Sequence, residues 1–240
     1  MPRAVAIETS GRVGSIAIVD RDPSTPIAEE AFPHGLAHAA QVVPIIDRLT
    51  RAAGWSPRDV EHLYISIGPG SFTGLRIAVT LAKTMALATG VKIVAVPSVR
   101  VLVENAPDDA TNAAIVLDAK RGQIFTASFT RSVYPARSDW VQTAPARVDT
   151  LSSVIANAPK PVHLIGEGIP YHQEAVSGVA DVILTDESSW RARAGVVARL
   201  GAQMAARGEF SDPWTLTPVY IRLPEAEEKW RLNQARRQGS

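Results

Sequence analysis

A glycine-rich stretch between a predicted strand and a predicted helix is the segment of this sequence best suited to chemistry. Residues 63–67 have the composition of a buried strand, and Ser71 is a suitable N-cap for a helix that would continue to about Ala88, before Gly90. Such a loop can bind an anion, because glycines let the backbone approach closely and a helix N-terminus presents free N–H groups. It lacks the Gly-Lys-Ser/Thr of a Walker A loop and the glycine spacing of a dinucleotide fingerprint, so local chemistry alone favours a tight strand-to-helix turn. The loop comprises Gly68, Pro69, Gly70, Ser71, Phe72, Thr73 and Gly74, followed by Leu75 and Arg76.

Two histidines four residues apart, His34 and His38, are the other feature that could do chemistry, as ligands of a metal ion. Both would have to lie on one helix, but Pro33 and Gly35 flank His34 and favour a loop there. No His-Glu-x-x-His motif occurs, and the absence of cysteine excludes thiolate metal sites and a cysteine nucleophile. We therefore expect two surface histidines, no metal, no cofactor and no catalytic set of a peptidase.

The composition is that of a folded protein without a strong overall electrostatic field. The 240 residues include 25 basic and 24 acidic side chains, so no long-range attraction draws the chain to nucleic acid or to an anionic membrane. The first apolar run is short and is interrupted by Glu8, unlike a signal peptide, and no run reaches the length of a membrane span. We expect a cytoplasmic protein without membrane contact.

Strands and helices alternate along the first half of the chain, as in an α/β layer architecture. Residues 4–7 and 13–19 predict an opening β-hairpin around a polar turn. Apolar side chains at helical spacing predict a helix over residues 36–53, kinked at Pro44, and residues 91–96 predict a buried strand.

The pattern restarts after a turn-rich segment at residues 105–112, which is the best candidate linker. Further elements are predicted at residues 114–117, 124–130, 162–165 and 181–184 (strands), 194–207 (helix) and 219–222 (a short closing strand). Beyond Pro224 the chain is charged and aperiodic, as in a loose tail or a surface helix. We predict a lobe over residues 1–106, a second lobe over 107–223 whose last segment can return to the first, and a charged tail over 224–240.

Five segments, in order along the chain, carry a resemblance to a known family. They are residues 6–10, His38 with residues 43–46, the loop at 68–76, residues 118–125 and residues 218–222. They resemble the opening strand, first long helix, signature loop, second-lobe hairpin and closing strand of the TsaB (formerly YeaZ) family, a branch of the actin-like and sugar-kinase-like ATPases. The resemblance implies an α/β fold with two lobes of the actin-like/ribonuclease H-like ATPase type, each a mixed sheet packed with helices.

The resemblance also implies a nucleotide cleft, which the sequence shows in degenerate form. ATPases of this superfamily need an acid after the first strand, a second acid opening the other lobe, and glycine-rich phosphate loops. Glu8 and Asp118 stand at the acidic positions, but Glu8 is one methylene longer than the usual aspartate. The candidate phosphate loop carries Glu167, which would repel a triphosphate. The predicted degenerate cleft comprises Glu8, Ser10, Asp118, Gly166 and Gly168.

A catalytic metal site is expected to be absent as well. The family's catalytic relative, TsaD, binds its metal through two histidines four residues apart, just after the strand that corresponds to residues 91–96. Ser98 and Leu102 stand at these positions here, and neither is a useful ligand for a transition metal.

The predicted second helix is apolar on almost every side, with Arg76 and Lys83 its only charges between residues 75 and 87. The sheet can cover one face, and the rest would be an exposed apolar patch unless the first helix covers it. In the family, the first two helices pair with the same helices of a second TsaB or of TsaD. The predicted partner interface comprises Leu36, Ala40, Val43, Arg76, Ile77, Thr80, Leu81, Thr84 and Leu87.

The resemblance finally implies a role in making threonylcarbamoyladenosine next to the anticodon of tRNA. The chain would be a non-catalytic scaffold that binds and activates a TsaD-type transferase, helps recruit a TsaE-type ATPase, forms a homodimer when alone and contacts tRNA only through the complex. The alternative is an independent small ATPase or kinase of the same fold, which would have to bind ATP and magnesium.

Overall fold

The first lobe is built on a five-stranded mixed sheet. The computed structural model describes residues 2–20, 22, 25–33, 37–132, 139–222 and 234. The strand order is β3-β2-β1-β4-β5, with β1, β2 and β3 antiparallel and β1, β4 and β5 parallel. The strands are β1 (Ala4–Glu8), β2 (Val13–Val19), β3 (Ala28–Pro33), β4 (His62–Ser66) and β5 (Lys92–Val96).

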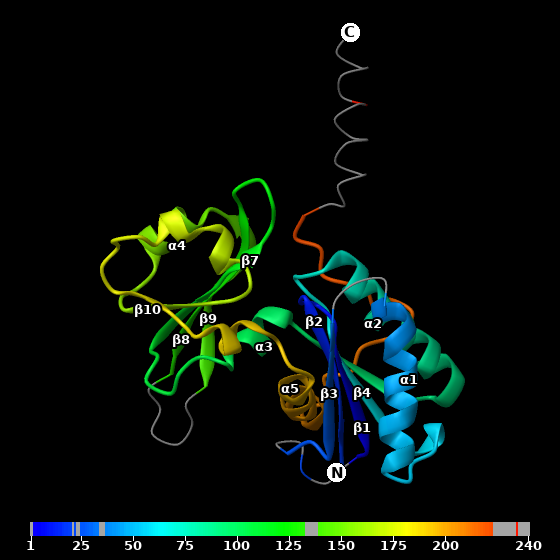
Figure 1. Ribbon diagram of the computed structural model, residues 1–240. Helices are drawn as coiled ribbons and strands as arrows, with labels where there is room; N and C mark the ends of the chain where they lie inside the picture. Colours follow the sequence, from blue (N-terminus) through cyan, green and yellow to red (C-terminus); the bar gives the residue numbers. More distant parts are fainter. Residues whose placement is uncertain are drawn as a thin grey trace.

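The second lobe repeats this topology (Figure 1). Its strands β9-β8-β6-β10-β11 have the same order and relative directions as β3-β2-β1-β4-β5, and β7 adds to the edge of β8. Two mixed sheets packed with helices confirm the predicted two-lobed α/β fold. The strands are β6 (Asn112–Ile115), β7 (Leu117–Asp118), β8 (Ile124–Arg131), β9 (Trp140–Asp149), β10 (Val162–Ile165) and β11 (Val182–Leu184).

Helices cover the outer face of each sheet and fill the space between the two sheets. On the outside, α1 (Ala37–Ala52) and α2 (Phe72–Thr89) pack on the first sheet and α4 (Leu151–Asn157) on the second. Between the sheets, α3 (Ser98–Val103) contacts β6 and β8 of the second lobe, and α5 (Ala194–Ala206) packs across four strands of the first. The helix α3 therefore packs on the second lobe and α5 packs on the first. One continuous buried core includes residues of both lobes. The boundaries 1–106, 107–223 and 224–240 stay a prediction.

Local signals explain where α2 begins and ends. The Ser71 side chain accepts a hydrogen bond from the Gly74 N–H, which satisfies a donor in the first turn. Gly90 stops the helix in the left-handed conformation at φ 77°. These bounds confirm the helix predicted after the glycine-rich loop, and α1 likewise continues through Pro44 over nearly its predicted length.

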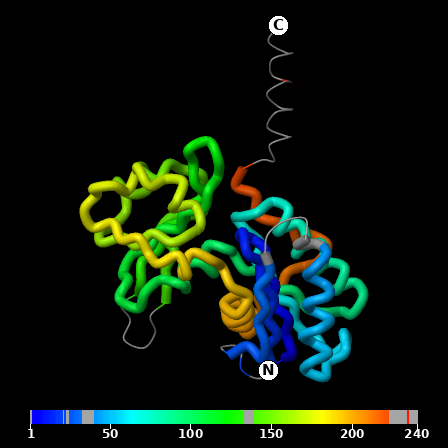
Figure 2. The backbone as a smooth tube through the Cα atoms, viewed as in Figure 1, coloured from blue at the N-terminus to red at the C-terminus, as the bar shows by residue number. Residues whose placement is uncertain are grey.

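The predicted closing strand at residues 219–222 is wrong. Only the Val219 N–H joins the first lobe's backbone at this point, through a 2.8 Å hydrogen bond to the Ile67 carbonyl, and no strand forms. After Val219 the segment turns away, because Tyr220 packs on the start of α2 and Arg222 reaches the second lobe. In Figure 2 this orange segment runs along the first lobe and ends beside the start of α2. We call residues 218–222 the C-terminal strap.

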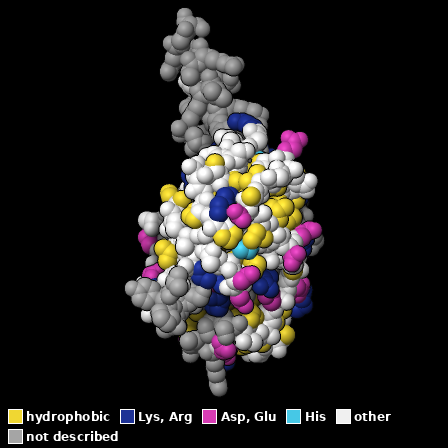
Figure 3. Space-filling view, turned by 90° about the vertical axis from the view of Figure 1, so that its left-hand side faces the viewer, with side chains coloured by type: hydrophobic (Ala, Val, Ile, Leu, Met, Phe, Trp, Pro, Cys, Tyr) yellow, Lys and Arg dark blue, Asp and Glu magenta, His cyan; other side chains and the backbone are white. Residues whose placement is uncertain are grey.

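Several predictions fall on residues outside the described part of the chain. These are Leu36 of the predicted interface, His34 of the histidine pair, and the tail apart from Gln234. Within the described residues, no helix is both long and apolar enough to cross a bilayer. Figure 3 shows the side on which the second lobe lies, where basic and acidic side chains are interspersed with apolar ones.

Candidate functional site

The glycine-rich loop joins α2 tightly to the turn that follows β1. The Ser71 N–H donates to the Ser10 carbonyl at 2.7 Å, and the Thr9 hydroxyl donates to the Gly74 carbonyl at 2.8 Å. At the other end of the loop, the Gly68 N–H donates to the Ser98 hydroxyl at 3.0 Å, and the Ser98 N–H donates to the Gly68 carbonyl at 2.9 Å. These backbone groups are engaged inside the protein, which is the arrangement of a strand-to-helix joint.

Ser98 and Leu102, which the family resemblance matches to metal-binding positions, both lie in the interior. Ser98 is fully buried and holds the glycine-rich loop, and Leu102 lies one turn further along α3 in the core shared by the lobes. Across the described residues, no group of three or more histidine, aspartate and glutamate side chains is placed to hold a metal ion.

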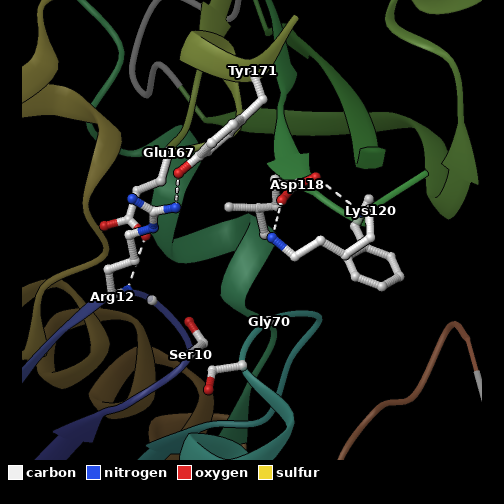
Figure 4. A pocket seen from close by; sticks show the side chains of 11 residues that line it. Ser10, Arg12, Gly70, Asp118, Lys120, Glu167 and Tyr171 are labelled. Carbon is white, nitrogen blue, oxygen red and sulfur yellow. Dashed lines mark hydrogen bonds and ion pairs between the residues drawn. The ribbon is translucent and has the colours of Figure 1, made fainter. Parts of the chain in front are cut away.

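A cleft with a volume of about 240 Å³ lies between the two lobes. It brings together Ser10 and the glycine-rich loop from the first lobe with Asp118 from the second, as Figure 4 shows. Three polar residues of the cleft, Arg12, Lys120 and Tyr171, were missed by the sequence analysis. The lining residues are Ser10, Gly11, Arg12, Gly70, Ser71, Leu117, Asp118, Lys120, Phe125, Glu167 and Tyr171.

The polar groups of the cleft contact one another, partly across the lobes. The Arg12 backbone N–H donates to Glu167 Oε2 at 2.9 Å, and its guanidinium donates to the Tyr171 hydroxyl and lies 5.1 Å from that ring (Figure 4). Lys120 forms an ion pair with Asp118. Burial alone would raise the pKa of Asp118, but the hydrogen bonds and charge of Lys120 outweigh it and lower this pKa below its ordinary value. The cations are thus committed to protein groups.

Gly166 and Gly168 do not line the cleft, and their role is close packing. The Gly168 N–H donates to the Val116 carbonyl at 2.9 Å, so this amide already has an acceptor within the protein. A Cβ atom at Gly168 would lie 2.7 Å from the Asp118 nitrogen, and one at Gly166 would lie 2.3 Å from the Val116 oxygen. The two glycines let the end of β10 pass against the end of β6.

Glu8 lies behind the cleft and is fully buried. One carboxylate oxygen accepts the Ser10 N–H, and the other has no hydrogen-bond partner among the described residues. Burial raises the pKa of Glu8 above its ordinary value, although the hydrogen bonds from Ser10 act in the opposite direction. A carboxyl group that is buried and holds its proton more tightly is poorly suited to position the water of a magnesium ion.

Replacing Glu8 by glutamine is expected to make the protein more stable at high pH but not at low pH. Because the folded chain binds the Glu8 proton more tightly than the unfolded chain, the contribution of Glu8 to stability is full below the ordinary carboxyl pKa and is lost as pH rises through the raised one. The gain should approach about 1.4 kcal/mol for each unit by which the pKa is raised. Urea unfolding from pH 4 to pH 8 measures it, with the exposed Glu174→Gln as control for the loss of one charge. Parallel pH curves for Glu8→Gln and wild type would contradict the expectation.

A second concave surface, an apolar groove of about 520 Å³, lies between α1 and α2 on the outside of the first lobe. Six residues of the predicted interface line the groove. Leu87 of the predicted interface is 61% exposed and lies near the C-terminal end of α2. Ala40 is an exposed residue of α1 outside the groove lining. The groove is lined by Val42, Val43, Phe72, Thr73, Arg76, Ile77, Thr80, Leu81 and Thr84.

Comparisons with known proteins identify the family. The model of the family described as "TsaD: tRNA N6-adenosine threonylcarbamoyltransferase" matches residues 35–183. The chain is 29% identical to the tRNA threonylcarbamoyladenosine biosynthesis protein TsaB of Bacillus subtilis, over 96% of this chain and 98% of that protein. It is 28% identical to the Escherichia coli protein of the same name, over 54% of this chain and 55% of that one.

A solved structure agrees on the fold. YeaZ from Pseudomonas aeruginosa superposes with a TM-score of 0.76 at 22% identity, over 92% of this chain and 100% of that one. The chain is a member of the TsaD family of proteins, and within it of the TsaB/YeaZ branch.

Proposed function

We propose that the chain is a non-catalytic scaffold subunit in the biosynthesis of threonylcarbamoyladenosine in tRNA, and that it binds and activates a TsaD-type transferase through the groove between α1 and α2. Membership of the TsaB/YeaZ branch supports the pathway, since curated members are named for it. The observation that carries the molecular role is the groove itself, an apolar surface that the fold leaves uncovered.

The groove has the form of a helix-binding site. Val43 on α1 is 54% exposed, whereas its neighbour Val42 is fully buried, so the apolar surface continues from the core to solvent. On α2, Ile77 and Leu81 are partly buried against the same core, with Ala78 beneath them. Side chains anchored in this way offer a preformed surface to the apolar face of an amphipathic helix.

The cleft between the lobes supports a scaffold more than an enzyme. Its candidate acid Glu8 is buried behind the lining, and the Gly168 amide that a phosphate would need donates to Val116. The two cations of the lining already contact protein groups: Arg12 donates to the Tyr171 hydroxyl, and Lys120 pairs with Asp118. One observation favours the alternative of an independent small ATPase or kinase, namely that a cleft containing Asp118 exists at all.

Titration with ATP and magnesium separates the two functions. We expect isothermal titration calorimetry to show no saturable binding up to about 1 mM ATP, because the cations of the cleft are paired and the second-lobe amide is engaged. Magnesium-dependent binding in the micromolar range, lost in Asp118→Asn, would support the kinase or ATPase instead.

The remaining parts of the proposal concern the assembly. The chain would help recruit a TsaE-type ATPase, self-associate when alone, and contact tRNA only through the complex. A formal net charge of +1 supports the last point, and on the face shown in Figure 3 basic side chains are interspersed with acidic and apolar ones. The direct test is reconstitution: the TsaD-type subunit of the same organism should modify tRNA only when this chain is present, and a transferase that is equally active alone would refute the scaffold.

A further inference from the structure

Arg76 is held rigidly at one end of the groove between α1 and α2. Its guanidinium carbon lies 3.7 Å from the centre of the Phe72 ring, and its Nε donates to the Tyr220 hydroxyl at 3.0 Å. The rings of Phe72 and Tyr220 are themselves 5.0 Å apart. We call these three residues the arginine clamp. An exposed arginine ordinarily keeps much of its rotamer freedom, and these two contacts favour one orientation before any partner arrives.

The C-terminal strap holds the clamp in place from two sides. Its Val219 N–H donates to the Ile67 carbonyl at 2.8 Å, just before the glycine-rich loop. Its Arg222 donates to the Ala119 carbonyl and to the side chain of Gln123, both in the second lobe. Tyr220 lies between these two attachments, so both lobes fix the hydroxyl that orients Arg76.

Among the described residues, the clamped guanidinium has no acidic partner. A guanidinium has five N–H donors, and only the one on Nε is engaged by Tyr220. Within the described parts of the chain, no ion pair joins Arg76 to a carboxylate. The remaining groove lining consists of aliphatic, aromatic and threonine side chains. A planar fork of donors beside an apolar surface matches a carboxylate approached in a bidentate manner.

We propose that the arginine clamp is a carboxylate receptor that selects the partner helix. This inference rests on the proposed docking role of the groove. The occupant would be a helix with an apolar stripe about 18 Å long, which corresponds to the twelve steps of about 1.5 Å from Phe72 to Thr84. It would carry an aspartate or glutamate at the end that meets Arg76.

The same argument disfavours a second copy of this chain as the occupant. The segments α1 and α2 contain one acidic residue, Asp47, which already pairs with Arg51 at 2.7 Å. Two identical faces would bring Arg76 against a surface that is neutral or basic. The clamp therefore favours a different subunit that carries the missing carboxylate over self-association.

Replacing Arg76 by leucine, lysine or glutamine, and Tyr220 by phenylalanine, tests the clamp. Isothermal titration with the purified TsaD-type subunit should show a loss of affinity of about 30-fold or more for Arg76→Leu. The variant would leave a carboxylate of the transferase buried in the interface without a cation to pair with. We expect about tenfold for Arg76→Lys, which keeps the charge but not the fork, and about threefold for Tyr220→Phe. Wild-type affinity should fall between 50 and 300 mM NaCl, and Arg76→Leu and Arg76→Gln should flatten this dependence.

Self-association of the chain provides the matched control. Sedimentation of Arg76→Leu alone should show self-association equal to or stronger than that of wild type, since a like charge is removed from an apolar face. Leucine is compatible with the apolar groove, so Arg76→Leu removes the charge without disturbing the surface. If this variant binds the transferase with undiminished affinity and an unchanged salt dependence, the clamp is wrong. If Arg76→Leu binds normally while Leu81→Glu does not, the clamp is wrong and the docking face stands; if Leu81→Glu also binds normally, the proposed function fails.

Discussion

Replacing Leu81 by glutamate is expected to abolish association with a TsaD-type subunit while leaving the chain folded. Leu81 lines the groove, and its side chain is partly exposed, so a glutamate can extend into water in the free chain. In the complex the same carboxylate would be covered without a partner, which costs several kcal/mol. This corresponds to a loss of affinity of about a thousandfold or more, comparable with much of an interface's net affinity. Gel filtration of the mixed subunits, with calorimetry for residual binding, measures the effect.

Two further variants separate loss of binding from loss of folding. Thr80→Glu places a carboxylate in the same groove from a position that is already exposed, and it should weaken binding in the same way. Leu184→Glu makes the same chemical change on β11 of the second lobe, where the leucine is 45% exposed, and it should bind normally. Retained association by both groove variants would exclude this face as the docking site.

Replacing Gly74 by alanine is expected to destabilise the whole molecule by about 3 kcal/mol or more. A Cβ atom there would lie 1.9 Å from the Thr9 carbonyl oxygen, a buried backbone atom that directly follows β1. The start of α2 cannot retreat without losing the Thr9 to Gly74 bond of 2.8 Å and the Ser71 to Ser10 bond of 2.7 Å. Urea unfolding followed by tryptophan fluorescence should show a large shift of the midpoint to lower urea.

Gly11→Ala in the adjoining turn is the control for this substitution. The nearest atoms to a Cβ at Gly11 belong to the Glu167 carboxylate, the closest at 3.5 Å, which is an ordinary contact. We expect a change within about 0.5 kcal/mol. Equal stability of Gly74→Ala and Gly11→Ala would mean that α2 does not pack against the first turn as closely as the structure places it.

Some elements were hidden from the sequence for identifiable reasons. The strand β9 is exposed or half-exposed at every residue after Trp140 and contains Pro145, so it shows no clear alternation. Irregular pairing with β8 holds it. The helix α3 is six residues long and rich in valine, a composition more typical of a strand. Its burial between the two sheets favours a helix, because a helix satisfies most of its backbone hydrogen bonds within itself. Tertiary packing overrode local preference in both.

The cleft shows the same division at the level of single residues. Asp118 and Ser10 could be assigned to one cleft because the family resemblance placed them there, and the structure brings both to its lining. The packing role of Gly168 could not be read from a Gly-Glu-Gly sequence, since it depends on how closely β10 passes the carbonyl of Val116. A glycine that exposes backbone N–H groups to a phosphate cannot be told by sequence from a glycine that allows a neighbouring strand to pack closely.

By itself the sequence determined the α/β class, the bounds of α2 through Ser71 and Gly90, and, through a family resemblance, the two lobes. These features follow from local signals, namely periodicity, helix caps and turn residues, which act within a few positions of one another. The arginine clamp was decided by tertiary structure alone, because Arg76 and Tyr220 are separated by 144 positions. The pairing of Arg12 with Glu167 spans 155 positions and likewise exists only when the lobes meet. No local pattern encodes such contacts, since they join residues that only the folded chain brings together.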